Sequence, residues 1–169
     1  MKRGLTLLLI LCLFLPSLSL ADCPVLTGLS EEEALSTLDA DASILEIVFP
    51  SVAGADACIL RMNGETMMID AASDSLALSS VLPALRAMDL DHIDTAFVSH
   101  PHDDHVRGFA ALAKNQITFD RMISCFPDNA NGQMILVKRT MIANGVAIAQ
   151  VADGDSWKLG EPAGVRTGC

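Results

Sequence analysis

Basic residues are scarce in this sequence of 169 residues, which has 11 lysines and arginines against 21 aspartates and glutamates. Its formal net charge is −10. A surface of this sign repels phosphate backbones at long range, so strong nucleic-acid binding is not expected. A metal ion can be the largest charge in its own pocket and can still attract an anion. The charge balance therefore argues against a protein that coats DNA, but not against an enzyme that cleaves a phosphodiester.

The sequence also lacks internal repeats, low-complexity segments and any C-x-x-C cysteine pair. Without such a pair, a zinc ribbon is not supported. Hydrophobic residues make up 51% and charged residues 19%, which is typical of a chain that forms a core and not of a disordered one. The length suits one domain, or part of a larger one.

Residues 1–21 have the pattern of a signal peptide. A basic start at residues 1–3 precedes an apolar run at residues 5–15, and Ser19-Leu20-Ala21 offers a cleavage site. The apolar run is too short for a permanent membrane helix, so no membrane anchor is expected. The alternative is a buried N-terminal helix. We predict export to the periplasm or the extracellular space.

Export would change how the cysteines behave. Cys23, Cys58, Cys125 and Cys169 would remain after cleavage, and four thiols in an oxidising compartment allow three pairings. Cys58 and Cys125 are equally consistent with small buried hydrophobic residues. The sequence does not choose between these alternatives.

The rest of the chain divides into a lead segment, residues 22–43, and a domain, residues 44–169. In the lead segment, residues 30–38 fit either a short helix or a solvated linker. Alternating strands and helices in the domain predict a mixed α/β or α+β fold, with a hairpin at Asn63-Gly64. The predicted strands are 44–49, 57–61, 66–69, 95–99, 121–125, 146–151 and 156–159, and the predicted helices begin at Ser80 and span 109–114 and 133–144.

Three of the four histidines lie in one short stretch, Ser99-His100-Pro101-His102-Asp103-Asp104-His105. Imidazoles and carboxylates suit zinc, and also iron or manganese. In an extended loop His100 and His102 would point the same way and could hold one ion. Asp104 and His105 would turn to the other side and could hold a second. The alternative is a solvated loop that happens to be rich in histidine.

This stretch resembles the H-x-H-x-D-H signature of the metallo-β-lactamase superfamily. The similarity runs from about residue 44 to residue 108 and continues more weakly to residue 160. Residues 44–49 and 54–60 look like the first strands of the branch related to the hydrolase domain of the competence protein ComEC. Residues 68–71 are similar to the family's Ile-Asp-x-Gly strand end.

The resemblance implies an αβ/βα sandwich, of which this chain would be the first half, incomplete at its C-terminus. It implies a two-metal zinc site, with His100 and His102 on the first ion and Asp104 and His105 on the second. It further implies that Asp104 takes a proton from the attacking water. Asp70 would orient the metal loop, the alternative being an exposed carboxylate at a strand end.

Three features depart from the family pattern. Arg107-Gly108 stands where Gly-Gly is common, and Ala72 replaces a glycine. The family's later metal-binding histidines have no counterpart, because the remaining histidine, His92, precedes the cluster. We interpret His92 as a surface residue in a helix-to-strand connection, and Asp153 and Asp155 as turn residues.

These features lead us to expect an exported metal-dependent hydrolase that acts on a phosphodiester or another ester-like bond of a small-molecule or phosphodiester substrate. The first ion lacks a third protein ligand, so the chain alone should be a poor catalyst or none. A homodimer could supply ligands in trans. The alternatives are a non-catalytic metal-binding or interaction protein and an inactive fragment.

Export can be tested on the expressed full-length chain. N-terminal sequencing of the periplasmic or secreted product should begin at Asp22, because the small-x-small pattern ends at Ala21. A cytoplasmic product that keeps Met1 would contradict the prediction.

Overall fold

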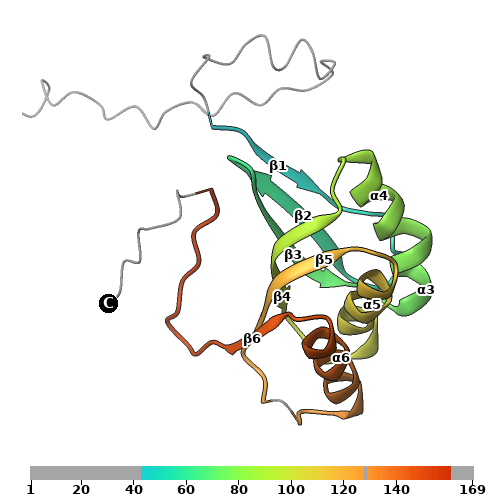
Figure 1. Cartoon of the computed structure of the whole chain (residues 1–169), viewed down its shortest axis with the longest axis vertical. Coiled ribbons are helices and arrows are strands. Elements are labelled where there is room, and N and C mark those ends of the chain that lie inside the picture. Colours follow the sequence, from blue (N-terminus) through green and yellow to red (C-terminus); the bar gives the residue numbers. More distant parts are fainter. Residues whose placement is uncertain (1–42, 128, 161–169) are drawn as a thin grey trace, which may run out of the picture. The chain divides into compact units, whose positions relative to one another are not determined.

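The computed structural model describes residues 43–127 and 129–160, which form a six-stranded sheet in the order β1-β2-β3-β4-β5-β6 (Figure 1). The first three strands are antiparallel, and β3 to β6 run parallel. The predicted signal peptide, Cys23, the possible helix at 30–38 and Cys169 lie outside the described residues. The strands are β1 (Leu45–Val48), β2 (Ala57–Met62), β3 (Glu65–Ala71), β4 (His92–Val98), β5 (Thr118–Ser124) and β6 (Ala147–Gln150).

The described helices connect the parallel strands and lie on one side of the sheet (Figure 1). Between β3 and β4 the chain forms α3 (Asp74–Leu76), the π-helical turn η2 (Ala77–Val81) and α4 (Leu82–Ala87). Helix α5 (Asp103–Lys114) connects β4 to β5, and α6 (Gly132–Ala143) connects β5 to β6. Such strand–helix–strand units are how parallel strands are joined, because a short turn cannot reverse the chain and restart it in the same direction.

The hydrophobic core lies between the sheet and these helices. Phe109 of α5 is fully buried, and its ring contacts Phe119 of β5 edge-on at a centroid distance of 5.9 Å. Fully buried side chains come from both layers: Ile59, Met68, Val98 and Met122 from strands, and Leu85, Leu112, Met134 and Met141 from helices. The mixed α/β fold class predicted from the sequence is therefore confirmed.

The hairpin between β2 and β3 is confirmed at the predicted residues. Asn63 and Gly64 have φ angles of 50° and 81°, and Met62 pairs with Glu65 across the turn. Positive φ at both central positions matches the twist of the two strands, which is why Asn-Gly is favoured there.

Two helix starts were predicted too late along the chain. The helix expected from Ser80 is preceded by helical turns that begin at Asp74, and the helix expected at 109–114 begins at Asp103. Asp103 and Asp104 occupy the first turn of α5, where carboxylates interact favourably with the exposed N–H groups. The end of the histidine cluster is therefore helical and not part of an extended loop.

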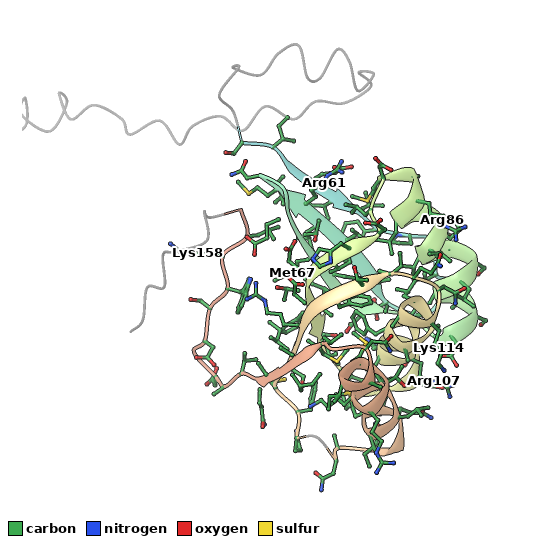
Figure 2. All side chains as sticks on the ribbon, viewed as in Figure 1. Arg61, Met67, Arg86, Arg107, Lys114 and Lys158 are labelled. Carbon is green, nitrogen blue, oxygen red and sulfur yellow. The ribbon has the colours of Figure 1, made fainter. Side chains whose placement is uncertain are left out.

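The strand predicted at 156–159 was wrong. This segment has no regular structure, and side-chain contacts hold it against the sheet instead. The Arg121 guanidinium lies 4.3 Å from the centroid of the Trp157 ring, and the Gly160 amide donates to Glu65 at 2.8 Å. Figure 2 shows Met67 on this side of the sheet, away from the helices.

Helix α5 approaches the end of β3 unusually closely at Gly108. The Gly108 amide donates to the Ala72 carbonyl at 2.9 Å. A Cβ atom at Gly108 would overlap the Ala71 carbonyl group and would lie 2.8 Å from the Ala77 Cβ. The first turns of α5, which carry the histidine cluster, are therefore fixed against β3 through a position that has room for glycine alone.

The Gly108→Ala variant should lose about 2 kcal/mol or more of unfolding free energy, because backbone atoms must move to admit the methyl group. The control is Gly132→Ala, where no atom lies within 4 Å of the new Cβ and stability should stay within about 1 kcal/mol of wild type. Urea unfolding followed by circular dichroism measures both. Equal stability of the two variants would contradict this account of the contact.

Candidate metal centre

The histidine cluster lies where β4 ends and α5 begins, at the carboxyl edge of the parallel strands. Residues 99–102 form the connection, and His102 is the N-cap of α5 in an extended conformation. Ligand sites in open α/β sheets occur at this edge, because the strand ends deliver several loops to one place.

His100 and His102 converge on each other. The Nε2 atom of His100 lies 2.9 Å from Nδ1 of His102, and the two rings meet edge-on with centroids 4.1 Å apart. His102 is exposed and His100 is half-buried, and an ion held between them would replace the hydrogen that these two nitrogens share. The expectation that these two side chains point the same way agrees with this geometry.

His105 is held in one orientation by a buried carboxylate. Its Nδ1 atom lies 2.8 Å from Oδ2 of Asp70, so Nδ1 carries a hydrogen and donates it. The other nitrogen, Nε2, faces Oδ2 of Asp56 at 3.5 Å and Oδ1 of Asp104 at 3.9 Å. A neutral His105 therefore directs its lone pair toward two further carboxylates.

The carboxylates around His105 also change its acidity. Burial opposes protonation of the imidazole, but the hydrogen bond to Asp70 and the charges of Asp70, Asp104 and Asp56 raise its pKa overall. Protons and a metal cation would compete for Nε2.

Asp70 is the residue that joins β3 to this connection. It is 2% exposed and accepts hydrogen bonds from the Ser99 amide, at 2.9 Å, and from the Ser99 hydroxyl as well as from His105. Asp70 is therefore hydrogen-bonded to the segment that carries the histidine cluster, and it is not an exposed carboxylate. Its φ of 56° and that of Ala72, 58°, show why glycine suits the end of this strand.

Two contacts of this site have no local sequence signal. The backbone of Asp56 lies between Asp104 and Ala72: its amide donates to the Asp104 carbonyl at 3.3 Å, and its carbonyl accepts from the Ala72 amide at 2.8 Å. Asn131 caps α6 through Met134 and also donates to the Pro101 carbonyl at 2.6 Å. Both residues come from segments far from the cluster in sequence.

The side chain of Arg107, two residues after His105, points away from the histidine cluster. Arg107 forms an ion pair with Asp74 and donates to Gln133 at 3.3 Å, and Figure 2 shows it on the helix side of the molecule. Its charge is therefore largely neutralised by Asp74, so it does not oppose a metal ion at the histidines.

A shallow cleft borders the cluster on the side of β2 and β3. It has a volume of about 360 Å³ and is lined by Phe49, Asp56, Ala57, Cys58, Ile69, Asp70 and Ser99. Cys58 is a free thiol there, and burial raises its pKa, so it carries little thiolate to act as a ligand or nucleophile. Cys125 is also free and is exposed, which excludes the interpretation of Cys125 as a buried hydrophobic residue.

His92 lies at the opposite end of β4 from the cluster. It is the first residue of that strand, whereas we had predicted that it belongs to the connection before the strand.

Asp153 lies in an exposed turn with Gly154, and Asp155 accepts a hydrogen bond from Ala152 at 2.7 Å. In this structure the turn residues do not bring a carboxylate to His100 or His102.

Residues 54–118 match the family model of the metallo-beta-lactamase superfamily. No curated protein matches the chain significantly. The matched region includes β2, β3, β4, α5 and the whole histidine cluster. This match supports the superfamily that the H-x-H-x-D-H signature implied and a fold of the metal-dependent hydrolase type.

In the described part of the chain, no helix is both long and apolar enough to cross a membrane.

The donor types fit a divalent transition metal, although no three of the predicted ligands bring their ligand atoms within 4.8 Å of one another in this structure. His100 and His102 offer converging nitrogens, His105 offers a nitrogen with a fixed tautomer, and Asp104 offers a half-exposed carboxylate. Imidazole with carboxylate is the ligand combination of zinc and of the neighbouring first-row metals.

The Asp70→Asn variant tests the buried carboxylate. Only one of the two terminal atoms of asparagine is an acceptor, so this side chain cannot keep all three hydrogen bonds from Ser99 and His105. Metal-free stability should fall by about 1–3 kcal/mol, and the loss of the negative charge should lower the His105 pKa. Because the His105 pKa is raised in the folded state, this interaction stabilises most at low pH and less as pH rises through that pKa. The stability gap to wild type should therefore be larger at about pH 5.5 than at about pH 8.5.

The control is Asp56→Asn, which removes a carboxylate facing the other nitrogen of His105. The Asp56 side chain is 69% exposed and 3.5 Å away, so stability should change by less than about 1 kcal/mol. Chemical unfolding in chelator, with imidazole titration by NMR, measures both effects. A loss in Asp70→Asn no larger than in the control would show that the buried hydrogen bonds do not hold the site.

Proposed function

We propose that this protein is a metal-dependent hydrolase whose metal centre forms at the connection between β4 and α5. The observation that carries the proposal is the arrangement of the three imidazoles. Those of His100 and His102 converge, and that of His105 is oriented by Asp70 so that, in the neutral ring, Nε2 carries the lone pair. A solvated loop that is rich in histidine by chance would not need a buried carboxylate to fix the tautomer of one ring.

His100 and His102 would hold one ion, and Asp104 with His105 would hold a second. Bound there, two such ions act as Lewis acids and supply an activated water. Zinc is the leading candidate, with iron and manganese as alternatives. Asp70 and Ser99 keep His105 in place, and Asp104, whose carboxylate is half-exposed, would accept the proton of the attacking water.

A phosphodiester or another ester-like bond is the proposed substrate class. The cleft beside the cluster combines apolar side chains, Phe49 and Ile69, with the carboxylates of Asp56 and Asp70. The carboxylates alone would repel an anion, so an anionic substrate would bind here only when cations occupy the site. The ComEC-related resemblance favours phosphodiesters within this class.

A second candidate is a metal-binding protein without catalysis. It is favoured by the count of histidines: of four in the chain, three lie in the cluster and His92 lies at the far end of β4. A catalytic zinc usually has three protein ligands and a water, and the first ion would have two histidines here. Turnover by the chain alone should therefore be slow, unless a second copy supplies a ligand.

The experiment compares metal content and hydrolysis in the full chain. His100→Ala/His102→Ala should contain less bound zinc than wild type, by the amount that the cluster holds, measured by elemental analysis after gel filtration. Asp104→Asn should reduce hydrolysis of bis(p-nitrophenyl) phosphate by about 100-fold or more, the usual effect of removing a general base. Light scattering should accompany each assay, because a dimer could complete the site.

The matched control is Asp103→Asn, which removes a neighbouring carboxylate that is exposed and is not assigned to either ion. It should keep activity within about threefold of wild type, since a surface charge changes rates little. Zinc bound at the cluster without hydrolysis of phosphodiester, carboxylic ester or thioester would favour the second candidate. Undiminished zinc in the double variant would refute the assigned ligands.

A further inference from the structure

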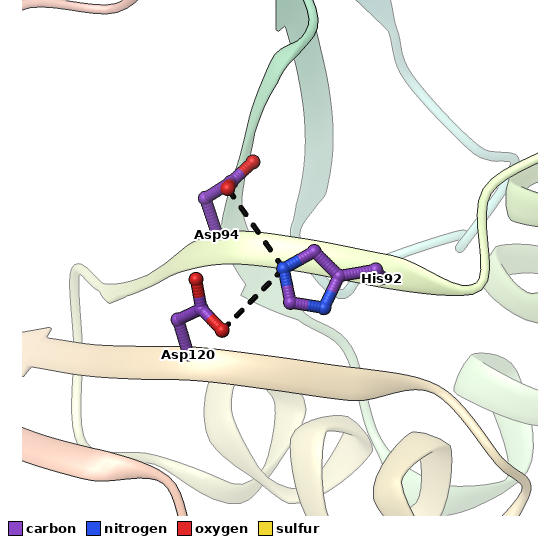
Figure 3. Close-up of side chains that lie close together, drawn as sticks. All are labelled: His92, Asp94 and Asp120. Carbon is purple, nitrogen blue, oxygen red and sulfur yellow. Dashed lines mark ion pairs between the residues drawn. The ribbon is translucent and has the colours of Figure 1, made fainter. Parts of the chain in front are cut away.

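A second group of potential metal ligands lies at the amino ends of β4 and β5. Figure 3 shows Asp94 of β4 and Asp120 of β5 reaching toward the imidazole of His92. One ligand atom from each of the three residues lies within 4.8 Å of the others, and no other such group of three occurs in the described residues. β4 has seven residues, so roughly 20 Å of strand separates this group from the histidine cluster.

The hydrogen bonds around His92 determine which ring nitrogen is free. The Thr118 hydroxyl lies 3.2 Å from the Asp91 carbonyl, to which it can donate its hydrogen, and 2.9 Å from Nδ1 of His92. When the hydroxyl donates to Asp91, its oxygen accepts from His92, and Nδ1 carries the hydrogen of the neutral ring. This leaves the lone pair on Nε2, which faces the two carboxylates.

Asp94 is oriented in the same way. Its Oδ2 atom accepts from the Thr66 amide at 2.7 Å and from the Thr66 hydroxyl at 2.6 Å, which leaves Oδ1 as the atom that faces His92. Burial raises the pKa of Asp94, but the hydrogen bonds from Thr66 and the nearby His92 lower it overall. The Asp94 carboxylate is therefore ionised near neutral pH, and Thr66 holds it in position.

With His92 neutral and its hydrogen on Nδ1, three acceptors converge with no donor among them. Nε2 lies 3.8 Å from Oδ1 of Asp94 and 3.5 Å from Oδ1 of Asp120, longer than ordinary hydrogen bonds. Two atoms bound about 2.1 Å from one tetrahedral ion are roughly 3.4 Å apart, close to both separations. The side chains of His92 and Asp120 are 42% and 64% exposed, so an ion could enter and keep a water ligand.

We propose that His92, Asp94 and Asp120 bind a divalent first-row transition metal such as Zn²⁺. One nitrogen and two carboxylate oxygens favour zinc and its neighbours over magnesium or calcium, which prefer oxygen ligands alone. An ion here connects β4 directly to β5, and through Thr66 and Asp94 to β3. This site is independent of the hydrolase proposed above and acts as a cross-link between strands.

The test is a Zn²⁺ titration of the full chain followed by NMR of the side-chain nitrogens of its four histidines. His92 Nε2 should shift on binding while Nδ1 stays protonated, and Mg²⁺ should produce no such change. His100, His102 and His105 report the other centre separately, so failure of one proposal is distinguishable from failure of the other. A His92 ring unmoved by excess Zn²⁺ would overturn the proposal.

Two variants test whether the three residues act together. Asp120→Asn removes one ligand and should weaken Zn²⁺ binding at His92 at least about tenfold. Thr118→Val removes the acceptor of the Nδ1 hydrogen and should weaken it by about 10–100-fold. The control, Asp91→Asn, removes an exposed charge beside the group without removing a ligand, and should change affinity by less than about threefold.

Equal Zn²⁺ affinity in wild type and Asp120→Asn would mean that the ion binds a lone surface histidine, and the proposal would fail. Thermal or chemical unfolding provides a check that leaves His92, Asp94 and Asp120 unchanged. In a His100→Ala/His102→Ala background, Zn²⁺ should still raise the unfolding midpoint, because it binds the folded arrangement of β4 and β5 preferentially. No change of the midpoint in that background would also count against the site.

Discussion

The hydrogen bonds of the buried Asp70 carboxylate hold three parts of the protein together. They connect the end of β3 to the chain leaving β4 at Ser99 and to the first turns of α5 at His105. A buried carboxylate is costly unless donors surround it, and here every donor comes from the segment that carries the candidate ligands. The position of the imidazoles is therefore determined by the same interaction that compensates the burial of a charge.

Close packing reinforces this connection from the other side. Gly108 lets α5 approach the backbone at Ala71 and Ala72, one and two residues after Asp70. Helix and strand are thus joined both by a side-chain hydrogen bond at His105 and by direct backbone contact one turn later. The backbone of Asp56 adds a third link, to Asp104. Together these contacts keep the cluster rigid relative to the sheet, which a site that must orient ligands requires.

The sequence was sufficient to predict features that depend on residues close together along the chain. The Asn63-Gly64 hairpin, the order of strands and helices and the ligand cluster all follow from local patterns. The structure confirms the hairpin, and it confirms the order of elements from β1 to β6. The sequence was insufficient where distant segments meet. The start of α5 was hidden because its first turn is polar and carries no apolar periodicity. The strand predicted at 156–159 failed because that segment contacts the sheet through Trp157 and Gly160 instead of pairing with it.

In the candidate site, too, some residues could be selected from the sequence and others could be found only in the folded structure. Asp70 could be selected by resemblance, whereas the contacts of Asp56 and Asn131 appear only once β2 and α6 lie beside the cluster. His92 was misplaced for a related reason. Taken alone it is a polar residue next to a turn, and its significance depends on Asp120, which becomes its neighbour only through the pairing of β4 with β5.

The stacking of Arg121 on Trp157 affects how the folding of this protein would be observed. Trp157 is the single tryptophan of the chain, and it belongs to the irregular segment after β6 instead of the core. Its fluorescence therefore reports whether that segment is seated on the sheet, while circular dichroism reports the helices and strands. Loss of the fluorescence signal before the loss of ellipticity would indicate local detachment of the segment, and a stability taken from emission alone would describe that detachment and not unfolding of the domain.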